Sequence, residues 1–407
     1  MKGERIMGKN LLIIHGGAPT AVLNCSLYGV IKEAKKYSEI EKIYAAKGGS
    51  GGVLNGNLLD LTDITDACLE NLRHTPGTAI GTSRDALEYE DYEKIAERLQ
   101  QYNIGWVLCN GGNGTMDTCG KIQQVCKQKS MDIKVIGIPK TMDNDIAITD
   151  HSPGFASAAQ YMAASTAELI ADVESLPLHI VILEAMGRNA GWVAASSCFA
   201  EEYGVSAPDL IYLPEVPFYQ EQFLQDVKRL IDQKGYGVIV VSEGLRTANN
   251  QPIVPPAFQV GRAVYFGDVC THLANTITQR LNYKTRAEKP GILGRASIAW
   301  QSEVDKQEAE QAGRTAVQAA IEGHTGKMVA FRRVSDIPYR SNPYLVDIQQ
   351  VMLYEKTLPS EFINGEGNGV TQQFKDWCRP LLSFPDKKME SAVVWKQKFT
   401  IKNQTRR

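Results

Sequence analysis

The sequence lacks the features that define several broad classes of protein. Its 407 residues carry 44 basic and 46 acidic side chains, so the positive excess of a nucleic-acid binder is missing. No run of apolar residues approaches the length of about 18 that a membrane span needs. Only four apolar residues, Leu11–Ile14, follow the charged N-terminal stretch, too few for a signal peptide. We therefore expect a cytoplasmic protein with no nucleic-acid partner and no membrane partner.

Metal-binding cysteine motifs and nucleotide-binding fingerprints are also missing. The eight cysteines form no CxxC pair and no ligand spacing with histidine. Several lie inside apolar runs, which is typical of small buried hydrophobes in a reducing compartment. No GxxxxGK[ST] or clean GxGxxG is present, so neither a Walker loop nor a dinucleotide-binding fold is indicated.

What the chain does contain is an alternation of strand-like and helix-like segments, with 43% hydrophobic residues, enough for two domains. Strand-like runs occupy 11–14, 104–109, 132–138, 178–185 and 237–241, and that at 132–138 is rich in β-branched residues. Apolar residues three or four apart mark helices over 21–36 and 116–126. This alternation predicts parallel sheets covered by helices, in two such units. After about residue 340 it fades into a polar extension ending in the clusters Lys396-Gln-Lys and Thr405-Arg-Arg, for which we favour a solvated tail.

Three glycine loops follow strand-like runs, at 15–19, 48–52 and 111–115. Glycine lets the backbone approach a ligand closely, and a helix that starts just beyond presents free N–H groups to an anion. Parallel strands end at the same edge of a sheet, so we expect these loops to converge there. The pattern favours a phosphate site over three unrelated turns.

One segment places unusual charge directly after a predicted buried strand. Residues 137–146, GIPKTMDNDI, carry Lys140, Asp143 and Asp145. Pro139 ends the strand, and Asp and Asn favour turns and caps, so a surface turn is one interpretation. A ligand site is the other, because open α/β sheets bind ligands where their strands end. The segment alone does not decide between them.

Together with the glycine loops, this segment resembles the phosphofructokinase family over roughly residues 10–325. The motifs stand in the family's order, and the ordered set is specific although each alone is weak. They are the glycine pair 16–17, Gly81-Thr-Ser-Arg84, Gly111-Gly-Asn-Gly-Thr115, Pro139-Lys-Thr-Met-Asp-Asn-Asp145, Met186-Gly-Arg188, Ser242-Glu-Gly244 and the pair Arg286 and Arg295. The resemblance implies phosphoryl transfer from ATP or pyrophosphate to the 1-hydroxyl of fructose 6-phosphate, giving fructose 1,6-bisphosphate in glycolysis.

The resemblance implies roles on the donor side. Asp143 takes the place of the general base that accepts the proton of the sugar hydroxyl. Lys140 and Thr141 lie beside the transferring group, and Asp145 with Asn113 is expected to hold Mg²⁺, the implied cofactor. The expected donor-binding residues are Gly16, Gly17, Arg84, Gly112, Asn113, Gly114 and Thr115.

The resemblance also implies an acceptor set. Arg286 and Arg295 match the two arginines that grip the 6-phosphate, since guanidinium forks suit a phosphate dianion. In many members the first arginine comes from a neighbouring subunit, as does the basic residue that His179 replaces, so a homodimer or homotetramer is expected. The remaining expected sugar-phosphate residues are Met186, Gly187, Arg188 (also catalytic), Glu243, Thr141, Asp143 and Asp145.

Four positions depart from the family's pattern. Asn113 replaces an aspartate that faces Mg²⁺, so an oxygen acceptor remains but the charge is lost; some long pyrophosphate-type members share this residue. Gly294 replaces a glutamine and Ile292 a histidine near Arg295, and His179 replaces an arginine or lysine. These departures leave a related ketose phosphate open as the acceptor.

Two positions separate the donors in this family. Pyrophosphate users tend to carry aspartate where this chain has Gly114, and lysine where it has Lys140. A carboxylate at the first position would repel the α-phosphate of ATP, whereas the flexible stem of a lysine can swing aside. The absent carboxylate therefore favours ATP, with pyrophosphate as the alternative.

The sequence thus predicts an α/β protein with two doubly wound parallel-sheet domains and the active site in the cleft between them. The expected boundaries are 1–154 for a donor-binding domain completed by about 293–350, 155–292 for a sugar-phosphate domain, and 351–407 for the C-terminal extension. Asn113 and His179 also motivate a non-catalytic homologue that binds sugar phosphate as a sensor or subunit. An NAD-linked or diphosphate-releasing α/β enzyme is a more distant alternative, because no nucleotide fingerprint is present.

Overall fold

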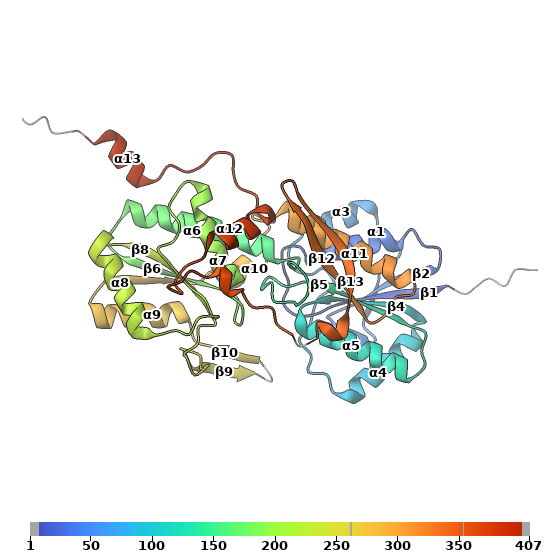
Figure 1. The fold of residues 1–407 in the computed structure, drawn as a ribbon. Helices are drawn as coiled ribbons and strands as arrows, with labels where there is room; N and C mark the ends of the chain where they lie inside the picture. The colour runs from blue at the N-terminus through green and yellow to red at the C-terminus, as the bar shows by residue number, and fades with distance from the viewer. Residues whose placement is uncertain (1–7, 261–262, 353, 401–407) are drawn as a thin grey trace, which may run out of the picture. The chain divides into compact units, whose positions relative to one another are not determined.

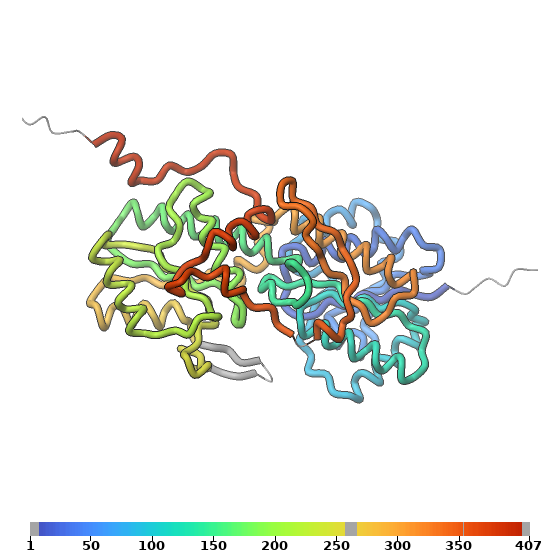
Figure 2. The backbone as a smooth tube through the Cα atoms, in the orientation of Figure 1, coloured from blue at the N-terminus to red at the C-terminus, as the bar shows by residue number. Residues whose placement is uncertain are grey.

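The structure, a computed structural model, describes residues 8–260, 263–352 and 354–400, the side chains of 257–266 excepted. By its internal contacts the chain divides into two units. Unit 1 takes the chain up to Ala158 and then Arg295–Lys356, and unit 2 takes Ala159–Gly294 and the chain from Thr357 onward. Figure 2 shows the chain returning to unit 1 with the orange segment and to unit 2 with the red one.

Unit 1 is built on a seven-stranded sheet with the order β13-β12-β5-β4-β1-β2-β3 (Figure 1). Its strands are β1 Lys9–His15, β2 Ile40–Ala46, β3 Leu58–Asp60, β4 Ile104–Gly111, β5 Lys134–Pro139, β12 Lys327–Asp336 and β13 Tyr339–Asp347. The five central strands are parallel, whereas β3 and β13 pair antiparallel at the two edges. The predicted parallel sheet is therefore present, with antiparallel strands added at its edges.

Helices cover both faces of this sheet because alternate strand residues face opposite sides. Leu11 and Ile13 pack in one apolar core with residues of α1 and α11, and Leu12 and Ile14 in the other with residues of α4 and α5. A Cβ at Gly29 would lie 2.1 Å from a carbonyl oxygen of α11, so glycine lets α1 and α11 pack closely. The helices are α1 Leu23–Ala34, α2 Ser50–Leu54, α3 Asp66–Leu72, α4 Tyr89–Gln101, α5 Asn113–Gln128 and α11 Glu303–Ile321, with the 3-10 helix η2 Ile348–Gln350.

Unit 2 contains a parallel four-stranded sheet with the order β11-β6-β8-β7. Its strands are β6 Ile180–Ala185, β7 Leu210–Tyr212, β8 Gly237–Ser242 and β11 Thr285–Glu288, and β9 Pro256–Val260 pairs separately with β10 Ala263–Phe266. The helices are α6 Phe155–Ser175, α7 Trp192–Ser196, η1 Ser197–Tyr203, α8 Gln220–Lys234, α9 Val269–Leu281 and α10 Ile292–Arg295; α6 and α10 cross the unit boundaries. Every residue of β6 and β8 is buried, as their continuous apolar sequences predict. An α/β fold with two sheet-containing units is thus confirmed.

The last described part of the chain packs onto unit 2 rather than lying in solvent. It forms η3 Ser360–Phe362, α12 Gln372–Cys378, η4 Arg379–Leu381 and α13 Ala392–Phe399. Phe374 is fully buried, and the ring centroids of Trp192 and Trp377 lie 4.8 Å apart. The expectation of a solvated tail is therefore wrong for residues 358–382, whose sparse aromatic and aliphatic side chains fill the core. It fits α13, in which no residue is buried, and Thr405-Arg-Arg lies outside the described residues.

Two expectations from composition can be compared with the structure. The eight cysteines all lie in the described residues and form no disulfide; seven are buried, which fits small hydrophobes, and Cys68 is exposed. Among the described residues, the helices are all too short or too polar to cross a membrane.

Candidate active site

Three of the predicted motifs meet where β1, β4 and β5 end. In the sheet His15 pairs with Asn110, and Gly111 with Pro139. The Gly16 N–H donates to the Asn110 carbonyl at 2.9 Å, and the Lys140 N–H donates to the Gly111 carbonyl at 3.0 Å. Parallel strands in register thus bring the segments 16–17, 111–115 and 139–145 to one edge of unit 1, as the sequence predicted.

Glycine is required at two of these strand ends. A Cβ at Gly16 or at Gly111 would lie 2.3 or 2.1 Å from the Thr115 hydroxyl oxygen, so the Thr115 side chain fills the space between both loops. Gly114 differs, because a Cβ there would meet no atom within 4 Å. The first turn of α5 is therefore open at the exposed Gly114, while the Thr115 N–H donates to the Gly112 carbonyl at 2.8 Å.

The glycine loop at 48–52 holds a carboxylate of the chain itself. Asp85 Oδ2 accepts hydrogen bonds from the Ser50 hydroxyl at 2.7 Å, the Gly51 N–H at 2.7 Å and the Ser83 hydroxyl at 2.5 Å. Burial raises the pKa of Asp85, but these hydrogen bonds outweigh it and hold the pKa below its usual value. This loop is thus filled by an internal anion, and the expected phosphate site there is corrected. Asp85 instead fixes the segment that carries Arg84.

Three cationic side chains lie within electrostatic reach of one another at this edge. The Lys140 ammonium donates to the carbonyls of Gly16 at 3.2 Å and Ala18 at 2.5 Å. Burial lowers the pKa of Lys140 to about 8, the charges of Arg295 and Arg84 add to the shift, and Asp143 opposes it. Burial and Arg84 likewise lower the pKa of Arg295, which Asp143 raises. The predicted residues Arg84, Lys140, Asp143 and Arg295 are therefore brought together in unit 1, with the net positive charge that a phosphate requires.

Asp145 and Asn113 leave two oxygen atoms facing no donor. Oδ1 of each is buried and without a hydrogen-bond partner in the described part of the chain, and the Asn113 amide donates to the Asp145 carbonyl at 3.2 Å. Burial raises the pKa of Asp145, while hydrogen bonds from Thr141 and Asn113 lower it. Adjacent carboxylate and amide oxygens without donors fit a hard cation such as Mg²⁺. Since the described residues contain no group of three or more His, Cys, Asp or Glu that could hold a metal ion, such an ion would take its other ligands from phosphate and water.

The chain between Asp143 and Asp145 forms a tight turn. Asn144 is buried with a φ of 54°, in the left-handed region, and its Oδ1 accepts the Ser152 N–H at 3.0 Å. The Asp143 N–H donates to the Thr141 hydroxyl at 3.1 Å. The segment 137–146 thus contains the turn that one interpretation expected, but this turn is largely buried rather than at the surface, and Asn144 places Asp143 and Asp145 on either side of it. The ligand site stays a prediction.

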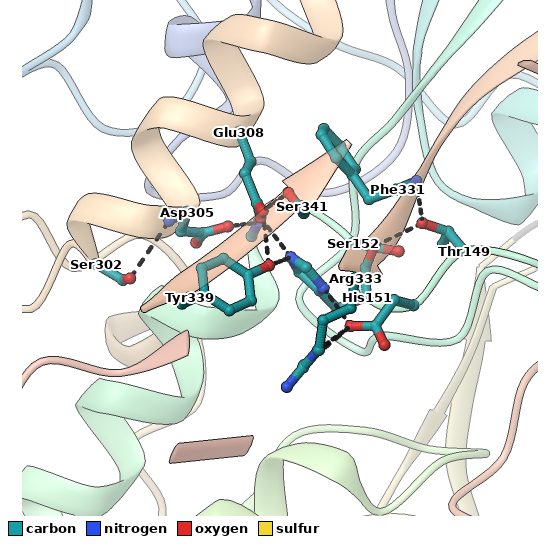
Figure 3. A network of polar contacts seen from close by, with 12 residues as sticks. Thr149, His151, Ser152, Ser302, Asp305, Glu308, Phe331, Arg333, Tyr339 and Ser341 are labelled. Carbon is teal, nitrogen blue, oxygen red and sulfur yellow. Dashed lines mark hydrogen bonds and ion pairs between the residues drawn. The ribbon is translucent and has the colours of Figure 1, made fainter. Parts of the chain in front are cut away.

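A buried charged network holds the far end of this turn (Figure 3). His151 lies between Asp150, whose Oδ2 is 2.8 Å from Nδ1, and Glu308 of α11, which contacts Nε2. The Tyr339 hydroxyl donates to Glu308 at 2.7 Å, and Arg333 forms an ion pair with Asp150 at 2.9 Å. Burial lowers the pKa of His151, but the two carboxylates outweigh it and raise the pKa to about 9, so the imidazole is protonated at neutral pH.

In unit 2 the predicted acceptor residues gather where β6 and β8 end. Ala185 pairs with Ser242, and the Glu243 N–H donates to the Ala185 carbonyl at 2.9 Å. The Gly187 N–H donates to Glu243 Oε1 at 3.3 Å. Burial raises the pKa of Glu243, which the Gly187 N–H and the nearby Arg188 lower. Met186, Gly187, Arg188 and Glu243 thus form one group.

His179 and Arg286 lie at the opposite end of the same sheet. His179 precedes β6, and Arg286 pairs with Val181 near the start of that strand. A strand rises about 3.3 Å per residue, so both are roughly 15 Å or more from Met186, which follows β6. His179 is buried, and burial with the charge of Arg286 lowers its pKa. The structure therefore separates these two predicted residues from the acceptor group of the same unit.

The fold is that of an α/β protein, and the first of these edges carries the glycine loops and the cationic side chains that the sequence predicted for a phosphate site. Residues 10–320 match the family model described as Phosphofructokinase, and the chain belongs to this family. A curated pyrophosphate–fructose 6-phosphate 1-phosphotransferase of Xanthomonas campestris pv. campestris is 36% identical, covering 92% of this chain and 91% of that one. A sulfofructose kinase of Alkalicoccus urumqiensis is 32% identical, covering 91% and 94%. The crystal structure of a pyrophosphate-dependent phosphofructokinase from Nitrosospira multiformis superposes with a TM-score of 0.84 at 34% identity, covering 93% and 94%.

Proposed function

We propose that this chain transfers a phosphoryl group from pyrophosphate to the 1-hydroxyl of fructose 6-phosphate. The observation that carries the proposal is the description of the X. campestris relative and of the N. multiformis structure, both matched over more than nine tenths of either chain. The sequence favoured ATP because Gly114 leaves the donor loop open. The comparisons favour the alternative, pyrophosphate, for which Lys140 is already in place.

In this proposal Asp143 is the general base. Its carboxylate accepts the proton of the 1-hydroxyl as the hydroxyl oxygen bonds to the phosphorus atom, and the bridging P–O bond of pyrophosphate breaks to release phosphate. Arg84 and Lys140 neutralise the charge on the donor. Mg²⁺ held by Asp145 and Asn113 would supply further neutralisation of the phosphate oxygens. Buried carboxylate and amide oxygens without donors support that assignment.

We assign the sugar hydroxyls to Glu243 and the loop Met186–Arg188, and the 6-phosphate to Arg295. We further propose that Arg286 and His179 reach the 6-phosphate from a second copy of the chain, in a homodimer or homotetramer. Their place at the opposite end of the unit 2 sheet from the acceptor loop supports this assignment.

ATP is the second candidate donor, which the open space at Gly114 favours. A steady-state assay with Mg²⁺ and either donor against fructose 6-phosphate, with a 6-sulfonated fructose as a further acceptor, separates the possibilities. We expect the highest kcat/KM with pyrophosphate and fructose 6-phosphate. A higher kcat/KM with ATP would show that ATP, not pyrophosphate, is the donor. Faster turnover of the sulfonated fructose would show that it, not fructose 6-phosphate, is the acceptor. Sugar-phosphate binding without turnover of either donor would favour the non-catalytic homologue.

A further inference from the structure

Lys356 lies outside the motifs and beyond residues 10–320, yet it contacts the turn that carries Asp143 and Asp145. Its backbone N–H donates to the Asp145 carbonyl at 2.7 Å. Its ammonium donates to the carbonyls of Thr149 and Asp150, each at 2.9 Å, and lies 3.4 Å from Asn144 Oδ1. The catalytic turn, defined here as residues 141–150, thus offers three oxygen atoms to the three N–H groups of one ammonium.

The turn needs such a partner because its backbone is strained. Asn144 and Ile148 both have positive φ values, 54° and 69°, which non-glycine residues rarely adopt without support. The neighbouring strands β12 and β13 contact the far end of the turn, where the Asp150 N–H donates to the Phe331 carbonyl at 3.0 Å and the Tyr344 hydroxyl donates to the Ile148 carbonyl at 2.7 Å. A short antiparallel bridge between Ile146 and Glu355 brings the chain before Lys356 alongside the turn.

The charge of Lys356 also matches its surroundings. Burial lowers the pKa of Lys356 to about 8 and Arg333 adds to the shift, but the carboxylates of Asp150 and Asp145 oppose it, so the ammonium is charged at neutral pH. Asp150 is in turn bound to His151 and Arg333, which belong to the buried network of Figure 3. Lys356 therefore links the two ends of the turn: its backbone N–H holds Asp145, and its ammonium holds Thr149 and Asp150, where the buried network also binds.

We propose that Lys356 is a positioning residue, which holds the catalytic turn so that Asp145 and Asn113 present their free oxygen atoms to Mg²⁺ and Asp143 faces the acceptor. The part that concerns Mg²⁺ and Asp143 rests on the proposed function, whereas the part that concerns the turn does not. Lys356 itself touches neither substrate nor metal in this proposal.

The test replaces Lys356 by methionine, which keeps the length of the side chain and removes its donors. Lys327→Met is the matched control, because Lys327 lies on β12 of the same unit and pairs only with the exposed Asp347 among the described residues. Hydrogen exchange of the peptide covering 141–152 is measured by mass spectrometry in the full-length, ligand-free protein. We expect faster exchange in Lys356→Met and wild-type exchange in Lys327→Met.

Calorimetry then measures binding of Mg²⁺ with pyrophosphate and, separately, of fructose 6-phosphate. We expect metal–pyrophosphate affinity to fall about 10- to 100-fold in Lys356→Met, as is typical when a residue that orients metal ligands is lost, and fructose 6-phosphate affinity to stay unchanged. Unaltered exchange of the turn would overturn the positioning role even in an active enzyme. Altered exchange with unaltered metal–pyrophosphate affinity would overturn the link to Mg²⁺. Absence of wild-type turnover would instead refute the proposed function. If the methionine variant does not fold, Lys356→Gln, which keeps two N–H donors, is measured in its place and judged by the same outcomes.

Discussion

Replacing Gly114 by aspartate tests what separates the two donors. Gly114 is the second residue of α5, it is exposed, and a Cβ there meets no atom within 4 Å. The new side chain therefore fits without moving the loop. An acidic residue in the first turn of a helix interacts favourably with the helix dipole, by about 0.3–1 kcal/mol. We expect Gly114→Asp to fold with unchanged or slightly raised stability, so that any loss of activity reflects the site.

The size of the effect follows from the added charge. Two unit charges about 4 Å apart repel by about 4 kcal/mol at an effective dielectric constant of about 20, which is roughly a thousandfold in an equilibrium or rate constant. ATP places its α-phosphate beyond the two phosphates that pyrophosphate has, and only this additional group would meet the carboxylate. We expect kcat/KM for ATP to fall by roughly a thousandfold and kcat/KM for pyrophosphate to change by less than about tenfold.

A coupled assay of fructose 1,6-bisphosphate formation measures both donors for wild type, Gly114→Asp and Gly114→Asn. If ATP is too poor a donor to assay, we instead compare, among the three proteins, the constant with which ATP inhibits the reaction that uses pyrophosphate. Asparagine has the size of aspartate without its charge, so it isolates the electrostatic part. An equal loss for both donors, or an equal loss of ATP use in the asparagine variant, would refute the charge argument.

Four further outcomes are expected. Asp143→Asn lowers kcat by about 10²- to 10⁴-fold in a steady-state assay without changing the melting temperature, and near-native turnover would remove Asp143 as the base. Arg295→Ala costs about 1.5–3 kcal/mol in the KM for fructose 6-phosphate, roughly 10- to 150-fold, and an unchanged KM means that the 6-phosphate is held elsewhere. Mixing Asp143→Asn with Arg286→Ala protein restores activity above that of either alone, because mixed oligomers contain intact sites; no gain argues against a shared site. The melting temperature falls as the pH rises from about 6.5 to about 9, since His151 has a raised pKa, so that its contribution to stability is full only below its unfolded pKa and is lost as the pH reaches its folded pKa; a variant Glu308→Gln with the same slope contradicts this.

Much of the fold was predictable because buried parallel strands have continuous apolar sequences. The runs at 132–138 and 178–185 correspond to β5 and β6, whose residues are almost all buried. The strands β3 and β7 were not predicted, because three residues are too few to show a period. The hairpin β12–β13 was not predicted, because from Arg332 onward exposed residues alternate with partly buried ones and no continuous apolar run marks the strands.

The site was predictable to the extent that its residues stand in motifs at strand ends. The contacts that support these motifs were not, because they join positions far apart in the sequence without any local pattern. Asp85 reaches Ser50 across 35 residues, Glu308 reaches His151 across 157, and Lys356 reaches Thr149 across 207. Nor could spacing reveal that Arg286 lies at the far end of its sheet, since nine residues separate it from Arg295 whatever the fold.

Transfer to the 1-hydroxyl is tested most directly by ³¹P NMR of the reaction mixture. Wild-type protein is incubated with Mg²⁺, pyrophosphate and fructose 6-phosphate, beside Asp143→Asn as the control. We predict that wild type forms fructose 1,6-bisphosphate and phosphate in equal amounts while pyrophosphate disappears, and that the control leaves the spectrum almost unchanged. Loss of pyrophosphate without the bisphosphate, or no change with pyrophosphate or with ATP in its place, would contradict phosphoryl transfer to the sugar.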